Sequence, residues 1–372
     1  MSLVIPSLTP GGAENVLALL ANAWAEEGRE VSVVTLGAAS ASDRRLHPAI
    51  TRIALDMVHV SANVLQALDS NWKRVRRLRA ELRGLRPHTV ISFLPSMNVL
   101  TLASTRTLDA RVVVAERIDP REEPIPKFWA CTRRLLYPHA DAVVLQTPDA
   151  KRWATRFLQA ERVHVIPNPV AYAPVPADAS SPRPAPVWLG APGHKVFGVG
   201  RLTPQKGFDT LLRAYARCRP HHPDWSLIIL GDGAERTRLE ALAVDLGIQT
   251  AVTFPGHIPD VPSILRGGDL FVLSSRYEGF PNALLDAMTC GLAVISTDCP
   301  SGPRHIVRHG IDGLLVERDN VEALAAAMRQ LMAAADLRQR LASRAVEVRE
   351  RFSLPSVMRQ WNALLEQCAE GA

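Results

Sequence analysis

The chain has 372 residues, of which 47% are apolar and 22% charged, and it carries a formal net charge of +6. This length and composition are those of a globular protein with two hydrophobic cores. The five cysteines show no paired spacing, so neither a disulfide framework nor a zinc site is expected. No apolar run reaches the ~20 residues that cross a bilayer, and no charged segment precedes an apolar one at the N-terminus. We therefore expect a cytoplasmic protein.

Short apolar strands alternate with helical patterns along both halves of the chain, which is typical of parallel sheets with crossover helices. The first strand is unusually short, which suggests that a few N-terminal residues are missing. The expected strands are 3–6, 31–36, 89–93, 112–115, 142–146 and 163–167, then 196–199, 227–230, 252–254, 270–273, 293–296 and 314–316. We expect an α/β protein with two doubly wound domains, 1–168 and 195–353, joined by a proline-rich linker, 169–194. A last helix, 354–368, can pack on either domain.

The positive charge lies in the first half. Residues 1–168 hold 22 lysines and arginines against 16 acidic residues, whereas residues 169–372 hold 21 of each. A helix over 72–86 surrounds an apolar stripe with basic side chains, namely Lys73, Arg74, Arg76, Arg77, Arg79, Arg83 and Arg86. One interpretation is a solvated helix, and the other is a basic face for anionic lipid headgroups or a lipid-linked diphosphate. We expect no nucleic acid partner, because no recognition motif accompanies the arginines.

Residues 200–207 place two cations at the end of a strand. Arg201 and Lys206 stand five residues apart, with a glycine on each side of the segment. Fixed cations at the carboxyl edge of a strand form a clamp for phosphate groups. No Asp-x-Asp pair occurs in the chain, so we expect no phosphate-bridging metal and no other cofactor.

Residues 277–291 combine an acidic loop with the start of a helix. Glu278 lies in the loop, Gly279 allows close approach of a ligand, Pro281 fits the first helical turn, and Gly291 can end the helix. A helix N-terminus carries roughly half a positive charge, so the adjacent carboxylate suggests a ligand with both hydroxyl and phosphate groups. A nucleotide sugar has both.

These motifs resemble a family 4 glycosyltransferase of the GT-B fold. The resemblance rests on Gly-Arg-Leu-x-x-x-Lys-Gly at 200–207, the segment 254–260, Glu-Gly-Phe-Pro at 278–281, Gly-x-x-Gly-Leu-Leu-Val at 310–316 and Gly-Gly-Ala-Glu at 11–14. It covers nearly the whole chain and implies two Rossmann-like domains that face each other across a cleft. The N-terminal domain would bind the acceptor and the C-terminal domain the donor.

The resemblance also implies residue roles. Donor binding would involve Gly12, Arg201, Lys206, His257, Ile258, Glu278, Gly279, Phe280, Pro281, Asn282 and Asp286. Glu278 would contact the hydroxyls of the transferred sugar, and the second acidic position would accept hydrogen bonds from the ribose. Family members usually carry Glu at that second position, and Asp286 has about 1.3 Å less reach. The alternative for Asp286 is a carboxylate on the helix surface.

The implied reaction retains the anomeric configuration. In the preferred route the leaving diphosphate takes the acceptor's proton, while Arg201, Lys206 and the N–H groups of 279–282 stabilise its charge. A double displacement would need a carboxylate near the anomeric carbon, for which Glu278 and Glu116 are the candidates. Glu116 and Arg117 follow a strand edge and are expected either to contact the acceptor or to form a structural salt bridge.

Substrates are implied by the resemblance alone. Segments 274–282 and 298–304 resemble the branch that builds bacterial surface polysaccharides and lipid-linked oligosaccharides, often from UDP-linked hexoses or N-acetylhexosamines. Arg304 would reach a phosphate or a sugar, or cap the following turn. The acceptor would be a sugar, often on a polyprenyl diphosphate, with peripheral contact to an anionic membrane at the inner face.

Other functions remain open at this stage. A GDP-sugar transferase and a UDP-sugar 2-epimerase share the fold, and a sugar-nucleotide binding protein without catalysis would explain Asp286. Gly231-Asp-Gly233 after a strand suggests a dehydrogenase, but the third glycine of the dinucleotide fingerprint is missing.

Overall fold

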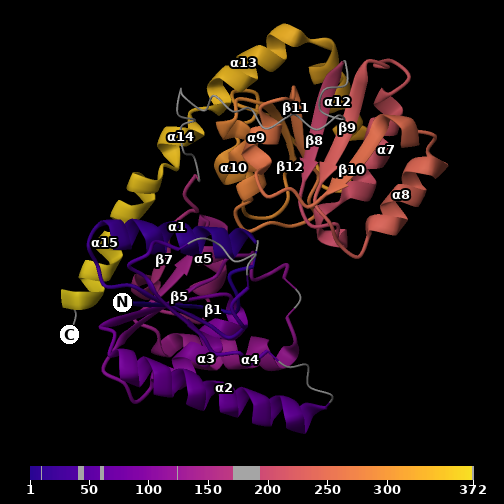
Figure 1. The fold of residues 1–372 in the computed structure, drawn as a ribbon. Coiled ribbons are helices and arrows are strands. Elements are labelled where there is room, and N and C mark those ends of the chain that lie inside the picture. Colours follow the sequence, from indigo (N-terminus) through magenta and orange to yellow (C-terminus); the bar gives the residue numbers. More distant parts are fainter. Residues whose placement is uncertain (10, 41–45, 59–62, 124, 171–192, 371–372) are drawn as a thin grey trace. The chain divides into compact units, whose positions relative to one another are not determined.

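The structure is a computed structural model that describes residues 1–9, 11–40, 46–58, 63–123, 125–170 and 193–370. It divides into two compact units, the first formed by Met1–Pro169 with Leu354–Ala372 and the second by Val170–Ser353. Each unit is one parallel sheet with helices on both faces (Figure 1). This confirms the expected α/β class with two doubly wound halves. Most of the expected linker lies outside the described residues.

Unit 1 is built on a seven-stranded sheet in the order β3-β2-β1-β4-β5-β6-β7, in which every pairing is parallel. Its strands are β1 (Ser2–Ile5), β2 (Ser32–Thr35), β3 (Thr51–Ala54), β4 (Thr89–Phe93), β5 (Arg111–Ala115), β6 (Ala142–Leu145) and β7 (Val163–Val165). The sequence pattern missed β3. This strand lies at the sheet edge and is exposed or half-buried throughout, so it lacks the apolar run of the central strands.

Successive side chains along each strand of unit 1 point to opposite faces of the sheet, and both faces are apolar. Its helices are α1 (Gly12–Glu26), α2 (Val64–Leu85), α3 (Pro95–Thr105), α4 (Lys127–Leu136), α5 (Pro148–Ala154) and α15 (Leu354–Glu370). Leu3 and Ile5 of β1 pack with α1 and α15, whereas Val4 packs with α2 and α3 on the opposite face. Each fully buried leucine or isoleucine contributes roughly 1.5–3 kcal/mol.

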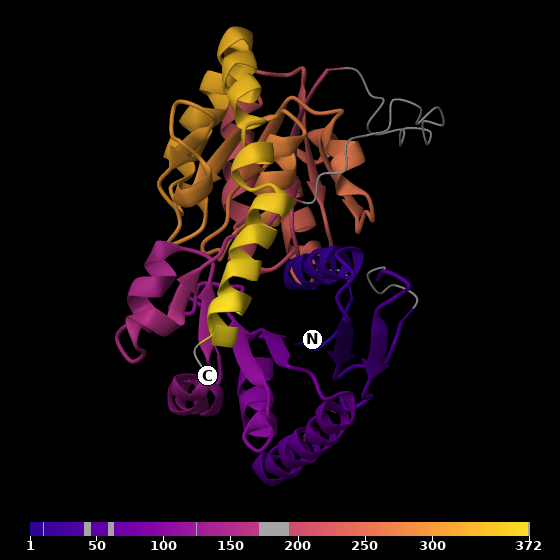
Figure 2. The same ribbon diagram turned by 90° about the vertical axis from the view of Figure 1, so that its left-hand side faces the viewer.

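The C-terminal helix α15 belongs to unit 1 although it follows unit 2 in the chain. Trp361 of α15 is fully buried and packs edge-on against Trp24 of α1, at a ring distance of 6.0 Å. Figure 2 shows α15 in yellow against the strands of this unit. Because Trp361 also stacks at 6.5 Å on Phe93, α15 is part of the core of this sheet.

Unit 2 is built on a six-stranded parallel sheet in the order β10-β9-β8-β11-β12-β13. Its strands are β8 (His194–Val199), β9 (Trp225–Leu230), β10 (Val252–Gly256), β11 (Leu270–Leu273), β12 (Ala293–Thr297) and β13 (Leu314–Val316). Its helices are α7 (Phe208–Cys218), α8 (Arg236–Asp245), α9 (Val261–Leu265), α10 (Asn282–Thr289), α11 (Pro303–Ile306), α12 (Val321–Ala333), α13 (Ala335–Ala345) and α14 (Val348–Arg351). Helices α7, α8 and α12 cover one face, and α9, α10 and α14 cover the other.

The basic helix expected over 72–86 is the second part of α2, which begins at Val64 after the side chain of Asn63 caps it. Leu78 and Leu82 are fully buried in the core of unit 1, and Arg79 donates to two backbone carbonyls of α3. The apolar stripe of this helix thus faces its own core. No helix within the described ranges is long and apolar enough to cross a membrane.

Candidate functional site

The two motifs of unit 2 meet where its strand order reverses. Strands β8 and β11 are neighbours in the sheet, although β9 and β10 lie between them in the chain. Residues 200–207 follow the carboxyl end of β8, and residues 274–281 follow that of β11. Ligands of open α/β sheets bind outside the carboxyl ends of the strands at such a reversal. We refer to these two segments as the cation loop (200–207) and the acidic loop (274–281).

Glu278 and Lys206 are brought into direct contact. The Lys206 Nζ donates to Glu278 Oε1 at 2.6 Å, and the Ser275 hydroxyl donates to the same oxygen at 2.6 Å. The two side chains are 16% and 7% exposed, so the ion pair is well shielded from water. In a buried ion pair, each charge offsets part of the desolvation cost of the other. A hydroxyl-bearing ligand at Glu278 would therefore lie beside a fixed cation.

Hydrogen bonds between backbone and side chains hold the two loops together. Ser274 Oγ donates to the Lys206 carbonyl at 2.8 Å, and Gln205 Nε2 donates to the Tyr277 carbonyl at 3.0 Å. Gly207 adopts φ +60°, and a Cβ there would lie 2.2 Å from the carbonyl oxygen of Ser274. Glycine is thus required both for the backbone conformation and for the close approach. The distance between the two charged side chains is set by this rigid junction.

Arg276 is a positioning residue that the sequence reasoning did not single out. Its guanidinium donates to both carboxylate oxygens of Asp209 on α7, at 3.1 and 2.9 Å, and pairs with Asp319 at 2.8 Å. Burial alone would raise the pKa of Asp209, but the hydrogen bonds from Arg276 hold that pKa below its usual value. Arg276 lies between Ser275 and Tyr277 in the segment 274–282, and this position was the only sequence signal that could have pointed to it.

The structure places Arg201 in the cation loop and helix α10 directly after the acidic loop. Arg201 is exposed, whereas the next residue, Leu202, is fully buried and fixes the start of the cation loop. Helix α10 begins at Asn282, directly after Pro281, and Gly291 with φ +79° follows its end. The first turn of α10 therefore presents N–H groups beside Glu278.

The remaining donor candidates fall into two groups. Asn282 and Asp286 are half-buried on α10, and His257 is exposed after β10, with Ile258 packed against the core. Phe280 is different, since its ring is 5% exposed and packs edge-on against Phe352 at 5.2 Å. Phe280 could thus contact a ligand only through its backbone.

In unit 1 the expected glycine loop leads into α1. Gly12 is the first residue of the helix, and Gly11 is its extended N-cap. A Cβ on Gly11 would lie 2.2 Å from a carboxylate oxygen of Glu14. The glycine therefore makes room for an acidic side chain in the first turn of α1, where it interacts favourably with the helix dipole.

Glu116 lies in a buried polar network at the carboxyl end of β5. The Tyr137 hydroxyl donates to Glu116 Oε1 at 2.5 Å, Arg133 contacts the same oxygen at 3.4 Å, and Asn98 donates to Tyr137 at 2.8 Å. Oxygen Oε2 has no hydrogen-bond partner among the described residues. Burial raises the pKa of Glu116, although Arg133 and Tyr137 oppose the shift. The structural ion pair expected as one alternative is present.

Arg117 is a buried cation that forms no ion pair within the part of the chain that the structure describes. Its guanidinium lies 3.9 Å from the ring centre of Phe93 and 5.7 Å from that of Trp361, and Nη1 donates to Asn168 at 3.1 Å. Atoms Nε and Nη2 are buried and find no hydrogen-bond partner in the described part of the chain. Burial lowers the pKa of Arg117 to about 9. Such an uncompensated charge is costly and marks a candidate site for an anionic group.

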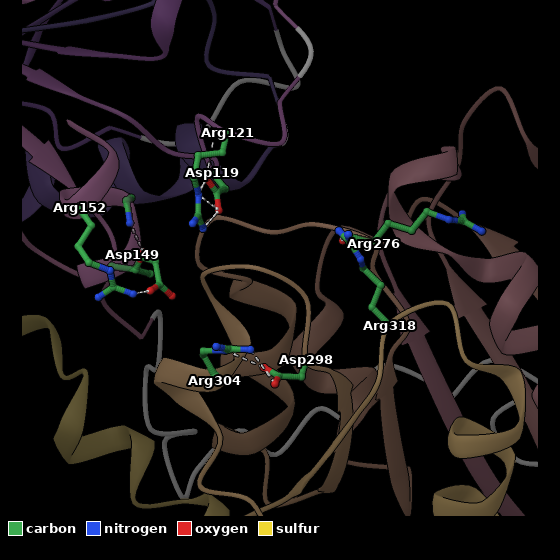
Figure 3. Close-up of polar contacts among 10 residues, drawn as sticks. Asp119, Arg121, Asp149, Arg152, Arg276, Asp298, Arg304 and Arg318 are labelled. Atoms are coloured by element: carbon green, nitrogen blue, oxygen red, sulfur yellow. Dashed lines mark hydrogen bonds and ion pairs between the residues drawn. The ribbon is translucent and has the colours of Figure 1, made fainter. Parts of the chain in front are cut away.

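Further ion pairs lie at the carboxyl edges of both sheets. Figure 3 shows Asp119 with Arg121 and Asp149 with Arg152 from unit 1, and Asp298 with Arg304 from unit 2. Arg304, expected to reach a ligand or cap a turn, donates two hydrogen bonds to Asp298 at 2.9 and 2.8 Å. No group of three metal-binding side chains occurs within the residues that the structure describes.

Comparison with known proteins covers both units. The model of the family "Glycosyl transferases group 1" matches residues 192–348, and that of "Glycosyl transferase 4-like domain" matches residues 11–169. The first match contains the cation loop and the acidic loop, and the second contains Gly12, Glu116 and Arg117.

Relatives match over very different lengths. An α-1,4-N-acetyl-D-galactosaminyltransferase of Campylobacter jejuni, named for a diphosphoundecaprenol-linked glycan, is 26% identical over 99% of this chain and 98% of its own. An exopolysaccharide phosphotransferase of Streptomyces coelicolor is 33% identical over 62% of this chain, which spans only 24% of that protein. The HepE protein of Anabaena, solved with UDP and glucose, is 21% identical, covers 99% of this chain and 100% of its own, and superposes with a TM-score of 0.79.

Proposed function

The chain belongs to the family 4, group 1 glycosyltransferases of the GT-B fold, and from this premise we propose that it transfers a hexose or N-acetylhexosamine from UDP to a lipid-linked sugar acceptor, with retention of configuration. The family match supports the broader assignment, a glycosyltransferase of polysaccharide or glycan biosynthesis. The UDP donor is supported by the UDP and glucose in the Anabaena structure, and the lipid-linked acceptor by the name of the Campylobacter relative.

The single observation that carries the proposal is the Glu278–Lys206 pair at the junction of the two loops. One ligand that offers hydroxyls to Glu278 and phosphate oxygens to Lys206 satisfies both charges at once. The N-terminus of α10 adds N–H donors on the same side, and Arg201 supplies a second, exposed cation. A nucleoside diphosphate sugar has its hydroxyls and its diphosphate in this adjacent arrangement.

The proposed reaction breaks the bond between the anomeric carbon and the diphosphate and forms a bond from that carbon to the acceptor oxygen. The acceptor's proton passes to the leaving diphosphate on the same face. Lys206 and Arg201 stabilise the charge that develops on the diphosphate, which is where fixed cations contribute most to the rate. Ser275 and Lys206 orient the Glu278 carboxylate, which holds the sugar hydroxyls.

We assign the anionic group of the acceptor, such as the diphosphate of a lipid-linked sugar, to Arg117 of unit 1. The support is the buried guanidinium with two unpartnered donor atoms at the carboxyl end of β5. Glu116 is 1% exposed in its network with Tyr137, so it acts on the reaction through the position of its neighbour rather than by direct contact.

Access to a lipid-linked acceptor requires contact with a membrane, and the outer face of α2 and α4 offers a suitable surface. Both helices pack with α3 in one layer of unit 1 (Figure 1). Their exposed apolar side chains, from 45% to 69% exposed, stand among basic residues and are Leu68, Trp72, Phe128 and Leu135. Aromatic and leucine side chains beside cations are typical of an interfacial surface on anionic lipids.

Vesicle sedimentation tests the membrane contact. The protein should bind vesicles with 30% anionic lipid and release them at high salt, because the electrostatic part is screened. Leu68→Ser with Trp72→Ser should weaken binding, whereas Val244→Ser, an equally exposed change in unit 2, should not. Equal binding of both variants would remove this surface from the proposal.

The transfer itself is tested by a thermal-shift and turnover screen. UDP or one UDP-sugar at about a hundred times its dissociation constant should add roughly 2.7 kcal/mol of stability. That sugar should then release UDP when a polyprenyl-diphosphate-linked acceptor is added. Stabilisation by GDP would change the donor, release of UDP without acceptor would favour an epimerase, and stabilisation by NAD alone would refute the proposal.

A further inference from the structure

Unit 2 contains a cavity of about 650 Å³ whose lining includes none of the expected donor residues. Pockets for small ligands measure roughly 300–1,000 Å³, so a sugar-sized molecule fits this volume. The cavity is lined by Asp298, Pro300, His309, Leu315, Val316, Glu317 and Arg318.

The cavity opens at the same edge of the sheet as the acidic loop. Asp298 follows β12, and Glu317 and Arg318 follow β13, which are the two strands next in order after β11. The Asp298 N–H donates to the Val316 carbonyl at 2.7 Å, which ties the two strand ends together. The carboxyl edge of a parallel sheet is where ligands of this fold class bind.

Polar groups at the rim are held in place by their neighbours. Arg304 fixes the Asp298 carboxylate with two hydrogen bonds (Figure 3), and Asn320 donates to Glu317 Oε2 at 2.9 Å. His309 Nδ1 accepts from the Leu315 N–H at 3.0 Å. Because these groups are already oriented, a ligand would not have to order them on binding.

The lining matches a neutral saccharide better than an anion or a metal. The cavity and its rim carry two carboxylates, Asp298 and Glu317, and two guanidinium groups, Arg304 and Arg318, so their charges cancel. Pro300, Leu315 and Val316 supply an apolar floor. A sugar ring presents an apolar C–H face and hydroxyls that both donate and accept, so it uses all of these groups.

The cavity is coupled to the acidic loop through Arg318. Its Nη1 donates to the Arg276 carbonyl at 3.0 Å, and Figure 3 shows its side chain directed toward Arg276. Ser301, in the loop after Asp298, forms a backbone bridge with Glu278. A molecule bound at Arg318 would therefore adjoin the segment that carries Glu278.

We propose that this cavity is a second saccharide subsite, which holds a residue of a multi-sugar acceptor beyond the residue that receives the transfer. The proposal rests on the proposed function, because it needs a carbohydrate acceptor. It adds that affinity increases with acceptor length and that Glu317 and Arg318 determine this increase.

An array of mono- to tetrasaccharides, probed with the full chain in saturating UDP, tests the subsite. We expect binding to oligosaccharides of two or more residues, at least tenfold weaker in Glu317→Ala and in Arg318→Met. Arg340→Ala, an exposed arginine on α13 of the same unit, is the matched control and should bind as the wild type does. A UDP thermal shift on every variant reports the donor site separately.

The results separate the two proposals. Three results overturn the subsite, provided that the wild type responds to UDP. The wild type binds no oligosaccharide, it binds only phosphate, or both variants bind oligosaccharides as tightly as the wild type does. Length-dependent binding lost in both variants supports it. If that loss occurs in a protein without any UDP response, the subsite stands and the proposed UDP donor fails.

Discussion

The charged clusters of the two units differ in how far their charges are compensated by other residues. In unit 2, Glu278 and Lys206 compensate each other at 2.6 Å, and hydrogen bonds fix the loops that carry them. In unit 1, Arg117 is buried against two aromatic rings and forms no ion pair among the described residues, and Glu116 is buried with one oxygen unpartnered there. The first cluster is stable before a ligand arrives. The second retains an electrostatic cost that a ligand of opposite charge would remove.

Lys206→Met should have the largest effect. It leaves the Glu278 carboxylate buried beside Ser275 alone, which should cost about 3–5 kcal/mol of stability, and it removes a cation from the leaving diphosphate, which should lower kcat about 10²–10³-fold. Urea unfolding and steady-state transfer measure the two effects. Lys206→Met combined with Glu278→Gln should restore stability but not activity. If the double variant regains activity, the pair is structural only.

Arg276→Ala should have the next largest effect, because it releases Asp209 and loosens the junction of the two loops. We expect a loss of about 1–3 kcal/mol at neutral pH, typical of hydrogen bonds to charged groups. The folded pKa of Asp209 is depressed, so its contribution is present above the unfolded pKa near 3.8 and is lost as pH falls through the folded value. The difference between wild type and variant should therefore shrink on acidification. A constant difference would show that Asp209 is not the partner that matters.

Arg117→Leu should raise stability by about 1–2 kcal/mol while it weakens acceptor-dependent activity. Burial lowers the folded pKa to about 9, well below the unfolded value, so folding disfavours the charged form. That cost is fully present below pH 9 and fades as pH rises above the folded pKa. Thermal unfolding at pH 7 and pH 10 should show a smaller advantage of the leucine variant at the higher pH. A destabilised variant would contradict the picture of an uncompensated charge.

Glu116→Gln should have the smallest effect, visible mainly in its pH dependence. The folded pKa of Glu116 is raised, so stability of the wild type should fall as pH increases from the unfolded value near 4.5 through the folded one. The glutamine variant should lack this decline and keep the hydrogen bond from Tyr137. Urea midpoints between pH 4.5 and 8 give the comparison, and parallel curves would mean that folding does not raise the pKa of Glu116.

The sequence was sufficient for the fold and for locating the charged residues of the cation loop and the acidic loop. Apolar runs that alternate with helical patterns identified every strand except β3, whose edge position requires no such run. The sequence also placed Arg201, Lys206 and Glu278 in loops after strands, because each of these residues follows a short apolar run in the chain.

Contacts between segments distant in the chain were beyond sequence reasoning. Lys206 and Glu278 are 72 residues apart, and their ion pair depends on the reversed strand order of β8 and β11. The stacking of Arg117 on Trp361 likewise joins β5 to the last helix. Phe280 was expected in the donor site because of its motif, but its ring is buried in the hydrophobic core of unit 2.

Isothermal titration of UDP into wild type, Lys206→Met and Arg340→Ala is the most direct measurement. If the cation loop and the acidic loop form a nucleotide-sugar site, wild type and Arg340→Ala should bind one UDP per chain, with affinity at least tenfold weaker in Lys206→Met. Equal affinity in all three proteins, or no heat of binding with wild type, would contradict the assignment of this site.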